Sequence, residues 1–200
     1  MVALYFKRDS DFYMNVSPSF HVLPLAAGHA RDLLDWRYQP PYDFYDPPEV
    51  DDPEHYIQQL LNPELHFHAI VGTRGIADNA TANTTNRNET MIGFCSYGVD
   101  GQVLGGDYSL AALDIGLGMK PCFTGQGLGV PFLQAILQHA RLNYAAVRFR
   151  LTVAEFNIRA LNLYHQLGFY AVDGFSDPEQ QIAYTILLAD TESFKDMACQ

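Results

Sequence analysis

Two short motifs in the second half of the chain carry residues that can hold an anion and move a proton. Gly125, Gly127 and Gly129 recur at every second position just before a predicted helix. The first N–H groups of a helix lack internal partners, and with the helix dipole they can hold a phosphate. Further on, Asn157 and Tyr164 lie about two helical turns apart, so an amide and a phenol share one face. Together these features favour transfer chemistry on a phosphorylated carrier.

The glycine turn alone is a weak signal, and the usual nucleotide fingerprints fail. Val130 stands where the G-x-G-x-x-G pattern needs its third glycine, and no Gly-Lys-Ser/Thr follows to make a P-loop. Pro131 supports a helix start here, because its missing N–H costs little in a first turn.

The strand predicted just before this turn, over residues 112–119, has one apolar face and one bare face. The apolar face carries Leu113, Ile115, Leu117 and Met119, and the other carries Asp114, Gly116 and Gly118. A strand face without side chains lets a ligand or another backbone approach closely, although a β-bulge is an equally common reason for such glycines.

These motifs belong to a mixed α/β pattern. Strands are predicted at 20–25, 66–72, 91–97, 112–119, 147–153, 169–172 and 182–189. Helices are predicted at 27–36, 53–61, from the glycine turn to about 144, and at 158–167. The order implies one sheet with at least one parallel pair, because the central helix must cross over. A polar segment at 78–89 is predicted to be a surface insertion.

Composition narrows the class of protein. The 200 residues carry a net charge of −11, which argues against a nucleic-acid partner and mildly favours a cationic substrate; ordinary solubility charge is the simpler alternative. The three cysteines have no C-x-x-C spacing, so we expect neither zinc nor disulfides, and a cytoplasmic protein. His66 and His68 alternate along a predicted strand but lack a third ligand, so no metal site is expected. No apolar run approaches the length of a membrane span.

At residues 124–129 and 157–169 the chain resembles the GNAT superfamily of acyl-CoA-dependent N-acyltransferases. The second segment matches Asn-x-x-Ala-x-x-x-Tyr-x-x-x-Gly-Phe in full, whereas Thr124 replaces the Gln or Arg of the family's turn. The resemblance covers roughly residues 19–189. It implies a GNAT-like mixed central sheet, in which strands 112–119 and 147–153 are parallel and splay apart, with flanking helices.

The resemblance also implies an N-acetyltransferase that moves an acetyl group from acetyl-CoA to a primary amine. Its cofactor-binding residues would be Leu117, Gly118 and Met119 at the pantetheine, Gly125, Gln126, Gly127, Leu128, Gly129 and Val130 at the pyrophosphate, and Asn157 and Tyr164 near the pantetheine and sulfur. As catalytic residues, Tyr164 would protonate the leaving thiolate and the backbone N–H of Met119 would stabilise the oxyanion.

The general base is open at this stage. One branch of the family, resembling ribosomal-protein alanine acetyltransferases, carries a glutamate where this chain has Thr152. Asp114 could accept the amine proton through water, Glu155 is a second candidate, and an amine that is already neutral needs no base. Arg148 and Arg150, which share a strand face with Thr152, are expected either to be solvated or to contact the cofactor's phosphates.

The acceptor is predicted to bind at the aromatic, acidic segment 36–52, because aromatic faces and carboxylates attract cations. The predicted acceptor-binding residues are Trp36, Tyr38, Tyr42, Tyr45 and Asp114. A proline-rich loop whose rings only pack onto the domain is the equal alternative. The acceptor would be an amine-bearing small molecule or peptide.

The expected domain organisation is an N-terminal extension at 1–18, an acetyltransferase domain at 19–190 and a tail at 191–200. A homodimer is possible. Two rival functions remain: a non-catalytic acyl-CoA-binding sensor on the same fold, and an unrelated nucleotide-binding protein.

Overall fold

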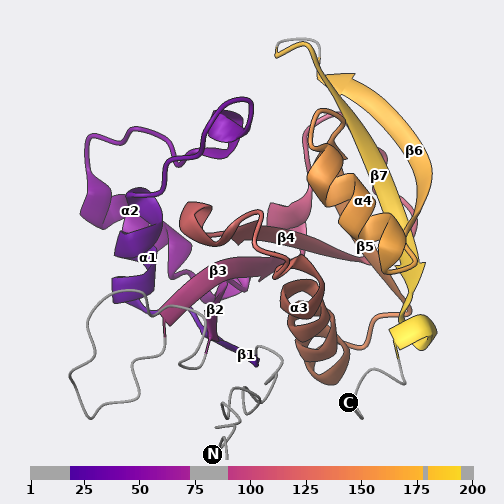
Figure 1. Ribbon diagram of the computed structural model, residues 1–200, viewed down its shortest axis with the longest axis horizontal. Coiled ribbons are helices and arrows are strands. Elements are labelled where there is room, and N and C mark those ends of the chain that lie inside the picture. The colour runs from indigo at the N-terminus through magenta and orange to yellow at the C-terminus, as the bar shows by residue number, and fades with distance from the viewer. Residues whose placement is uncertain (1–18, 73–89, 178–179, 195–200) are drawn as a thin grey trace, which may run out of the picture.

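The computed structural model describes residues 19–72, 90–177 and 180–194 (Figure 1). Its strands are β1 Phe20–Pro24, β2 His68–Gly72, β3 Thr90–Tyr97, β4 Leu113–Met119, β5 Arg148–Ala154, β6 Tyr170–Asp177 and β7 Ile182–Asp190. Its helices are α1 Ala27–Leu34, α2 Pro53–Leu60, α3 Gly129–Asn143 and α4 Ile158–Gln166. The predicted order of strands and helices is confirmed, and so is the mixed α/β fold.

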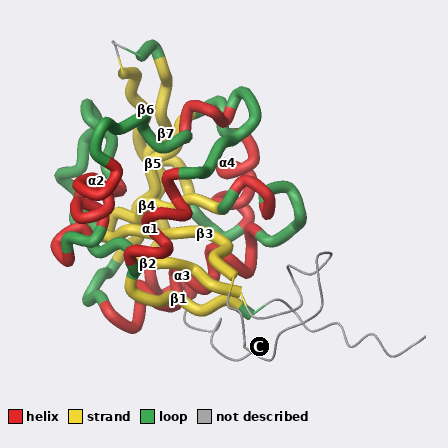
Figure 2. The backbone as a smooth tube through the Cα atoms, turned by 90° about the vertical axis from the view of Figure 1, so that its left-hand side faces the viewer, coloured by secondary structure: helices red, strands yellow, loops and turns green. Residues whose placement is uncertain are grey.

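The strands form one sheet in the order β1-β2-β3-β4-β5-β7-β6. Every neighbouring pair is antiparallel except β4 and β5, which run parallel because α3 crosses over between them. Figure 2 shows the strands stacked in this order, with the β6–β7 hairpin at one end and β1 at the other.

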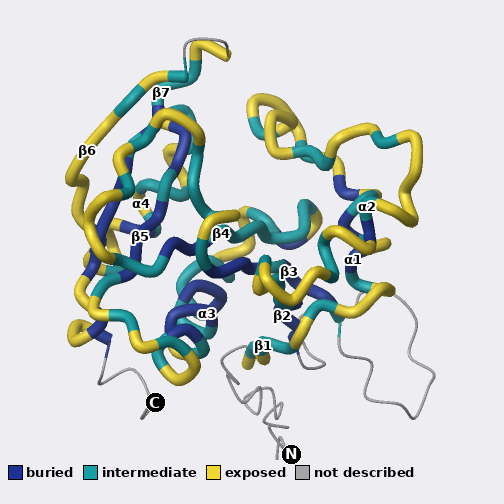
Figure 3. Tube along the Cα trace, turned by 180° about the vertical axis from the view of Figure 1, so that it is seen from behind, coloured by how far each residue is buried: buried dark blue, intermediate teal, exposed yellow. Residues whose placement is uncertain are grey.

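The helices cover both faces of the sheet, and the main core lies beneath α3 and α4. Phe132, Leu133, Ile136 and Leu137 of α3 are fully buried there, with Phe149 and Leu151 of β5. A smaller cluster on the opposite face joins Leu33 and Trp36 to Ala69 and Met91, beneath α1. In Figure 3, α3 is largely dark blue, whereas the edge strand β6 is mostly yellow.

Local sequence signals explain where the short helices begin. Asp52 caps α2, since its carboxylate accepts a hydrogen bond of 3.0 Å from the backbone N–H of His55, and Pro53 occupies the first turn. Asn157 caps α4 in the same way, accepting a 3.2 Å bond from the N–H of Ala160.

Three expectations about local structure need correction. β2 starts at His68, because a 3₁₀ turn precedes it and His66 adopts the left-handed region at φ 49°. The two histidines therefore do not alternate on one strand, and the described residues contain no metal-binding group of His, Cys, Asp and Glu. The proline-rich loop holds a 3₁₀ turn, η1 at Tyr42–Tyr45, between its two proline pairs.

The remaining differences concern the C-terminal part and the insertion. β6 runs five residues beyond its expected end, with an irregular register between Ala171 and Asp173. Phe194 is buried against Phe149 and Phe169, so the core extends at least four residues past the expected domain boundary. The predicted surface insertion at 78–89 and the extension at 1–18 lie outside the described residues.

Candidate functional site

The parallel strands β4 and β5 separate almost as soon as they pair. Leu113 pairs with Phe149 and Asp114 pairs with Arg150, and no further pairing follows although β4 continues to Met119. The rest of the two strands encloses an opening, which we call the strand gap. The splayed pair implied by the resemblance is thus confirmed.

The edges of β4 show which backbone groups face the strand gap. Asp114 C=O accepts from the N–H of Gly98, and Lys120 N–H donates to Ile92, so even-numbered residues of this stretch bond to the β3 side. Because backbone groups alternate between the two edges of a strand, Leu117 and Met119 face the gap. Gly118 instead pairs with Phe94 of β3, so its backbone is not free for a pantetheine.

The bare face of β4 is filled by the protein itself rather than left open. A Cβ on Gly118 would clash with the Phe94 ring, and a Cβ on Gly116 would clash with the Ser96 hydroxyl. Both glycines are therefore explained by side chains of β3 that cross over β4. Close approach by another backbone, which is one of the expected explanations, also applies at Gly116, because a Cβ on Gly101 would be 2.8 Å from the Gly116 nitrogen.

The glycine turn has the geometry that an anion site needs. Gly125 and Gly127 have φ values of 75° and 76°, and a Cβ on either would meet nothing within 4 Å. Glycine is therefore required at these two positions by the backbone conformation and not by a lack of space for a side chain. α3 begins directly afterwards at Gly129, and its N-cap residue, Leu128, makes no side-chain capping bond. The first N–H groups of α3 thus lack a side-chain cap.

Asn157 and Tyr164 stand on α4 as expected, and both have structural roles as well. Asn157 caps the helix through Oδ1 and donates from Nδ2 to the Tyr45 hydroxyl at 3.3 Å. Tyr164 is buried and packs against Phe169. Burial, and then the neighbouring Tyr45, raise the pKa of the Tyr164 phenol, so it stays protonated at neutral pH. Among the described residues the Tyr164 hydroxyl has no hydrogen-bond partner, so its proton is not held by another group.

The aromatic loop reaches both walls of the strand gap. We call residues 38–46 the aromatic strap. The Tyr38 hydroxyl donates to the Met119 carbonyl at 2.9 Å, on the β4 wall. The Tyr45 hydroxyl accepts from Asn157 on the opposite wall. Two predicted acceptor-binding residues therefore already contact two predicted cofactor-binding residues.

The other predicted acceptor aromatics are engaged inside the protein. Trp36 is 4% exposed, and its indole N–H donates to Asp32 at 3.3 Å, so it packs the core rather than lining a cleft. The Tyr42 ring lies 3.7 Å from the Arg159 guanidinium, so its cation-binding face is already taken. These contacts support the packed-loop alternative for Trp36 and Tyr42.

Asp114 and Arg150 form a buried ion pair at the point where the strands part. Arg150 Nε and Nη2 donate to the two carboxylate oxygens of Asp114 at 2.6 and 2.9 Å. The Asp114 side chain is 5% exposed and the Arg150 side chain is 3% exposed. Gln102 donates a third bond to Asp114 at 2.8 Å, and Arg150 also donates to the Leu110 carbonyl. Arg150 and Gln102 thus occupy the carboxylate of Asp114, the residue considered as a general base. Arg150 is accordingly neither solvated nor free to contact a phosphate.

The two other residues considered near the base position have partners of their own. The Thr152 hydroxyl lies 3.2 Å from the hydroxyl of Tyr108, whose ring also receives the Arg150 guanidinium at 4.9 Å. Glu155 is exposed and accepts a 3.2 Å bond from the Thr185 hydroxyl. Sequence patterns do not identify Tyr108 as a member of this network, because it follows a run of turn residues.

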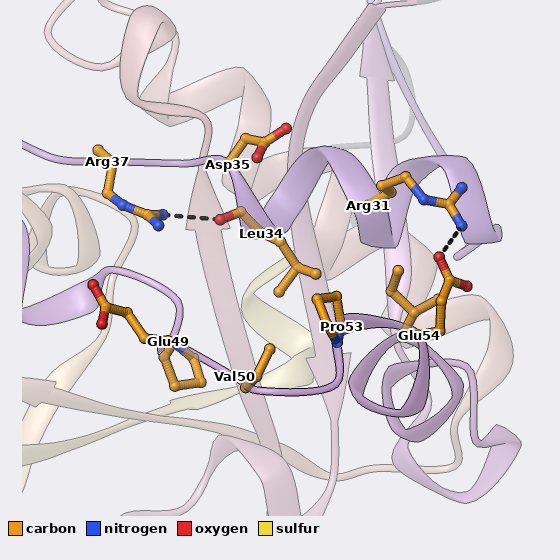
Figure 4. Close-up of a pocket in the computed structure, with 10 residues that line it drawn as sticks. Arg31, Leu34, Asp35, Arg37, Glu49, Val50, Pro53 and Glu54 are labelled. Atoms are coloured by element: carbon orange, nitrogen blue, oxygen red, sulfur yellow. Dashed lines mark hydrogen bonds and ion pairs between the residues drawn. The ribbon is translucent and has the colours of Figure 1, made fainter.

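A separate surface pocket of about 390 Å³ lies between α1, α2 and the segment that joins them (Figure 4). Arg31 and Glu54 form an ion pair across it, and Arg37 bonds to the Leu34 carbonyl. None of the predicted site residues lines this pocket. Within the described ranges, no helix has the length and apolar content to cross a bilayer.

Comparisons with known proteins agree with the fold. A family model described as the acetyltransferase (GNAT) family matches residues 30–169. No curated protein sequence matches the chain.

Solved structures match over nearly their whole lengths. Mutant forms of the spermidine/spermine N-acetyltransferase SpeG from Vibrio cholerae give a TM-score of 0.57 at 15% identity, covering 90% of this chain and 99% of that one. The aminoglycoside acetyltransferase AAC(6')-Ib, in complex with coenzyme A and kanamycin, gives 0.63 at 15% identity, covering 88% and 98%. A complex of AAC(6')-Ib with acetyl-CoA gives 0.64 at 14%, covering 91% and 99%. At these identities the likeness shows a shared fold.

Proposed function

The chain belongs to the acetyltransferase (GNAT) family, and we propose that it transfers an acetyl group from acetyl-CoA to a cationic primary amine on a small molecule or peptide. The observation that carries the proposal is the strand gap. It supports the proposal because β4 leads into the glycine turn at the start of α3, and β5 leads into α4, which carries Asn157 and Tyr164.

Each wall of the gap has a role in holding acetyl-CoA. The uncapped N–H groups of α3 and the turn from Gly125 to Val130 bind the pyrophosphate. The gap-facing backbone groups of Leu117 and Met119 pair with the pantetheine amides, and the Asn157 amide adds a side-chain contact once Tyr45 releases it. Gly118 has no part in this contact, because its backbone belongs to the β3 edge.

Two groups then serve acyl transfer. The N–H of Met119 faces the gap and stabilises the oxyanion that forms at the thioester carbonyl. Tyr164 remains protonated because burial raises its pKa, and it supplies the proton that the leaving thiolate needs. Asp114 is not proposed as the base, because Arg150 and Gln102 already occupy its carboxylate.

The acceptor class follows from charge and from related folds. The net charge of −11 attracts cations, and the solved relatives named above include a spermidine/spermine N-acetyltransferase and an aminoglycoside acetyltransferase. Of the aromatic residues predicted to bind the acceptor, Tyr38 and Tyr45 of the aromatic strap contact residues at the gap.

The test is thiol release from acetyl-CoA with spermidine, kanamycin and an unblocked peptide as acceptors. Tyr164→Phe should keep acetyl-CoA affinity and lower kcat by roughly 10–10³-fold, within the range of general acid–base catalysis. Tyr170→Phe, at an exposed position on β6, is the matched control and should have no effect. Acetyl-CoA binding without thiol release for any acceptor would instead identify a non-catalytic acyl-CoA sensor.

A further inference from the structure

A carboxylate on the turn after β3 lies over the middle of β4. This 3₁₀ turn, η3 at Val99–Gly101, has Asp100 at its centre. Asp100 Oδ2 accepts a 2.7 Å hydrogen bond from the hydroxyl of Ser96, which is fully buried. A Cβ built on Gly116 would lie 3.5 Å from the same oxygen. The Asp100 carboxylate therefore lies over Gly116, which is the neighbour of Leu117 in β4, and the backbone groups of Leu117 face the strand gap.

Three glycines make this placement possible. Gly98 directly follows β3 and has a φ of 101°. Nothing lies within 4 Å of a Cβ at this position, so glycine is required there only by the backbone conformation. Gly101 lets the turn lie flat on β4, since its Cβ would be 2.8 Å from the Gly116 nitrogen. Gly116 leaves room for the Ser96 hydroxyl that holds Asp100. The chain is thus built to bring this carboxylate onto the strand.

Asp100 differs from Asp114 in having an uncompensated charge. Asp114 is buried and neutralised by Arg150. Asp100 is exposed, and within the described part of the chain it has no lysine or arginine partner. A carboxylate with one hydrogen bond and no cation can still bind an ammonium group through its free oxygen.

The surroundings of Asp100 also suit an amine. Tyr56 of α2 is half-buried, and burial, followed by the negative charge of Asp100, raises the pKa of its phenol. The Tyr56 hydroxyl therefore stays protonated. Tyr56 lies on α2, which follows the aromatic strap in the chain.

We infer that Asp100 binds the amino group of the acceptor and takes its proton, an inference that rests on the proposed function. The amine nitrogen forms the C–N bond with the thioester carbonyl carbon, and the C–S bond breaks with its electron pair moving to sulfur. One nitrogen proton passes to the Asp100 carboxylate, which returns it to solvent. The thiolate takes its proton from Tyr164, and the second nitrogen proton leaves the newly formed amide to restore the Tyr164 phenol. Ser96 is a positioning residue, since it acts through Asp100.

The experiment measures spermidine binding by calorimetry, with and without coenzyme A, and kcat/KM for spermidine in the acetyl-transfer assay. Asp100→Asn should weaken spermidine binding about 10- to 100-fold, because a charge-assisted hydrogen bond is lost. It should lower kcat/KM by roughly 10²–10⁴-fold if proton transfer is lost as well. Acetyl-CoA affinity and the melting temperature should not change.

Two further variants separate a specific effect from a general one. Asp107→Asn removes an equal charge from the same loop and should leave spermidine binding unchanged, since that carboxylate only accepts the local Ser109 N–H. Ser96→Ala should raise the spermidine KM while the conservative Ser96→Thr restores it in part. If Asp100→Asn binds spermidine as tightly as the unmodified protein, or if Asp107→Asn weakens binding equally, the inference is overturned. If spermidine binding depends on Asp100 but no acetyl transfer occurs, the proposed function fails and the amine site stands.

Discussion

Replacing Asp114 by asparagine should destabilise the protein far more than the loss of an exposed ion pair does. The carboxylate accepts three hydrogen bonds, at 2.6 and 2.9 Å from Arg150 and at 2.8 Å from Gln102. Removing one partner of a buried pair costs about 3–5 kcal/mol. Arg150 would keep its 2.8 Å bond to the Leu110 carbonyl and its place 4.9 Å from the Tyr108 ring, so the lower end is expected.

A loss of about 3 kcal/mol is large enough to measure by urea unfolding. For a domain of this size it corresponds to a fall in Tm of about 6–12 °C. The matched control is Asp190→Asn, which breaks the 3.2 Å pair with Arg148 at a surface where the side chains are 56% and 37% exposed. That variant should lose less than about 1 kcal/mol.

The double variant Asp114→Leu with Arg150→Met completes the experiment. Because it leaves no unpaired buried charge, it should be more stable than Asp114→Asn alone. The reasoning would be refuted if Asp114→Asn were as stable as Asp190→Asn while its kcat collapsed. Asp114 would then be a catalytic base, as the sequence first suggested, rather than a brace between β4 and β5.

Three other changes test the turn, the strap and a half-buried histidine. Gly127→Ala places a side chain at φ 76° and should cost about 1–2 kcal/mol and weaken acetyl-CoA binding by calorimetry, whereas Gly28→Ala, in open space on α1, should be neutral or stabilising. Tyr45→Phe frees the Asn157 amide and should tighten acetyl-CoA binding; weaker binding would mean that the Tyr45 hydroxyl itself contacts the ligand. Burial lowers the pKa of His139 to about 4, so its neutral form stabilises the fold above about pH 6.5 and this stabilisation is lost as pH falls toward 4. His139→Gln should therefore lose less Tm between pH 7 and pH 4.5 than the unmodified protein, and equal losses would contradict this.

The elements and the cofactor motifs could be predicted because they depend on local signals. The glycines of the turn, the caps of α2 and α4 and the alternation in β4 each act within a few residues of the chain. The gap between β4 and β5 came from the family resemblance rather than from residue patterns. Its geometry could not be read from either strand alone, since both continue past the last pair.

The pairing of charges could not be predicted, because it depends on contacts far apart in sequence. Asp114 and Arg150 are 36 positions apart. The alternation of side chains along β5 puts Arg150 on the same face as Arg148, whose ion pair with Asp190 is at the surface. Trp36 was assigned to the acceptor site because of its aromatic neighbours, yet the structure buries it against Phe94. The placement of Asp100 depends on the close packing of Gly101 against β4, which local sequence patterns do not reveal.

Because β4 and β5 pair over only a short stretch, the sheet consists of two half-sheets with little backbone pairing between them. β1 to β4 form one half and β5 to β7 the other, and backbone pairing joins them at only two positions. Asp100 belongs to the first half and Asn157 and Tyr164 belong to the second, while the aromatic strap contacts both, through Tyr38 on Met119 and Tyr45 on Asn157. A ligand seated in the gap contacts both halves and so adds a joint between them. Its binding should make the two halves melt together, sharpening the thermal transition as well as raising its midpoint.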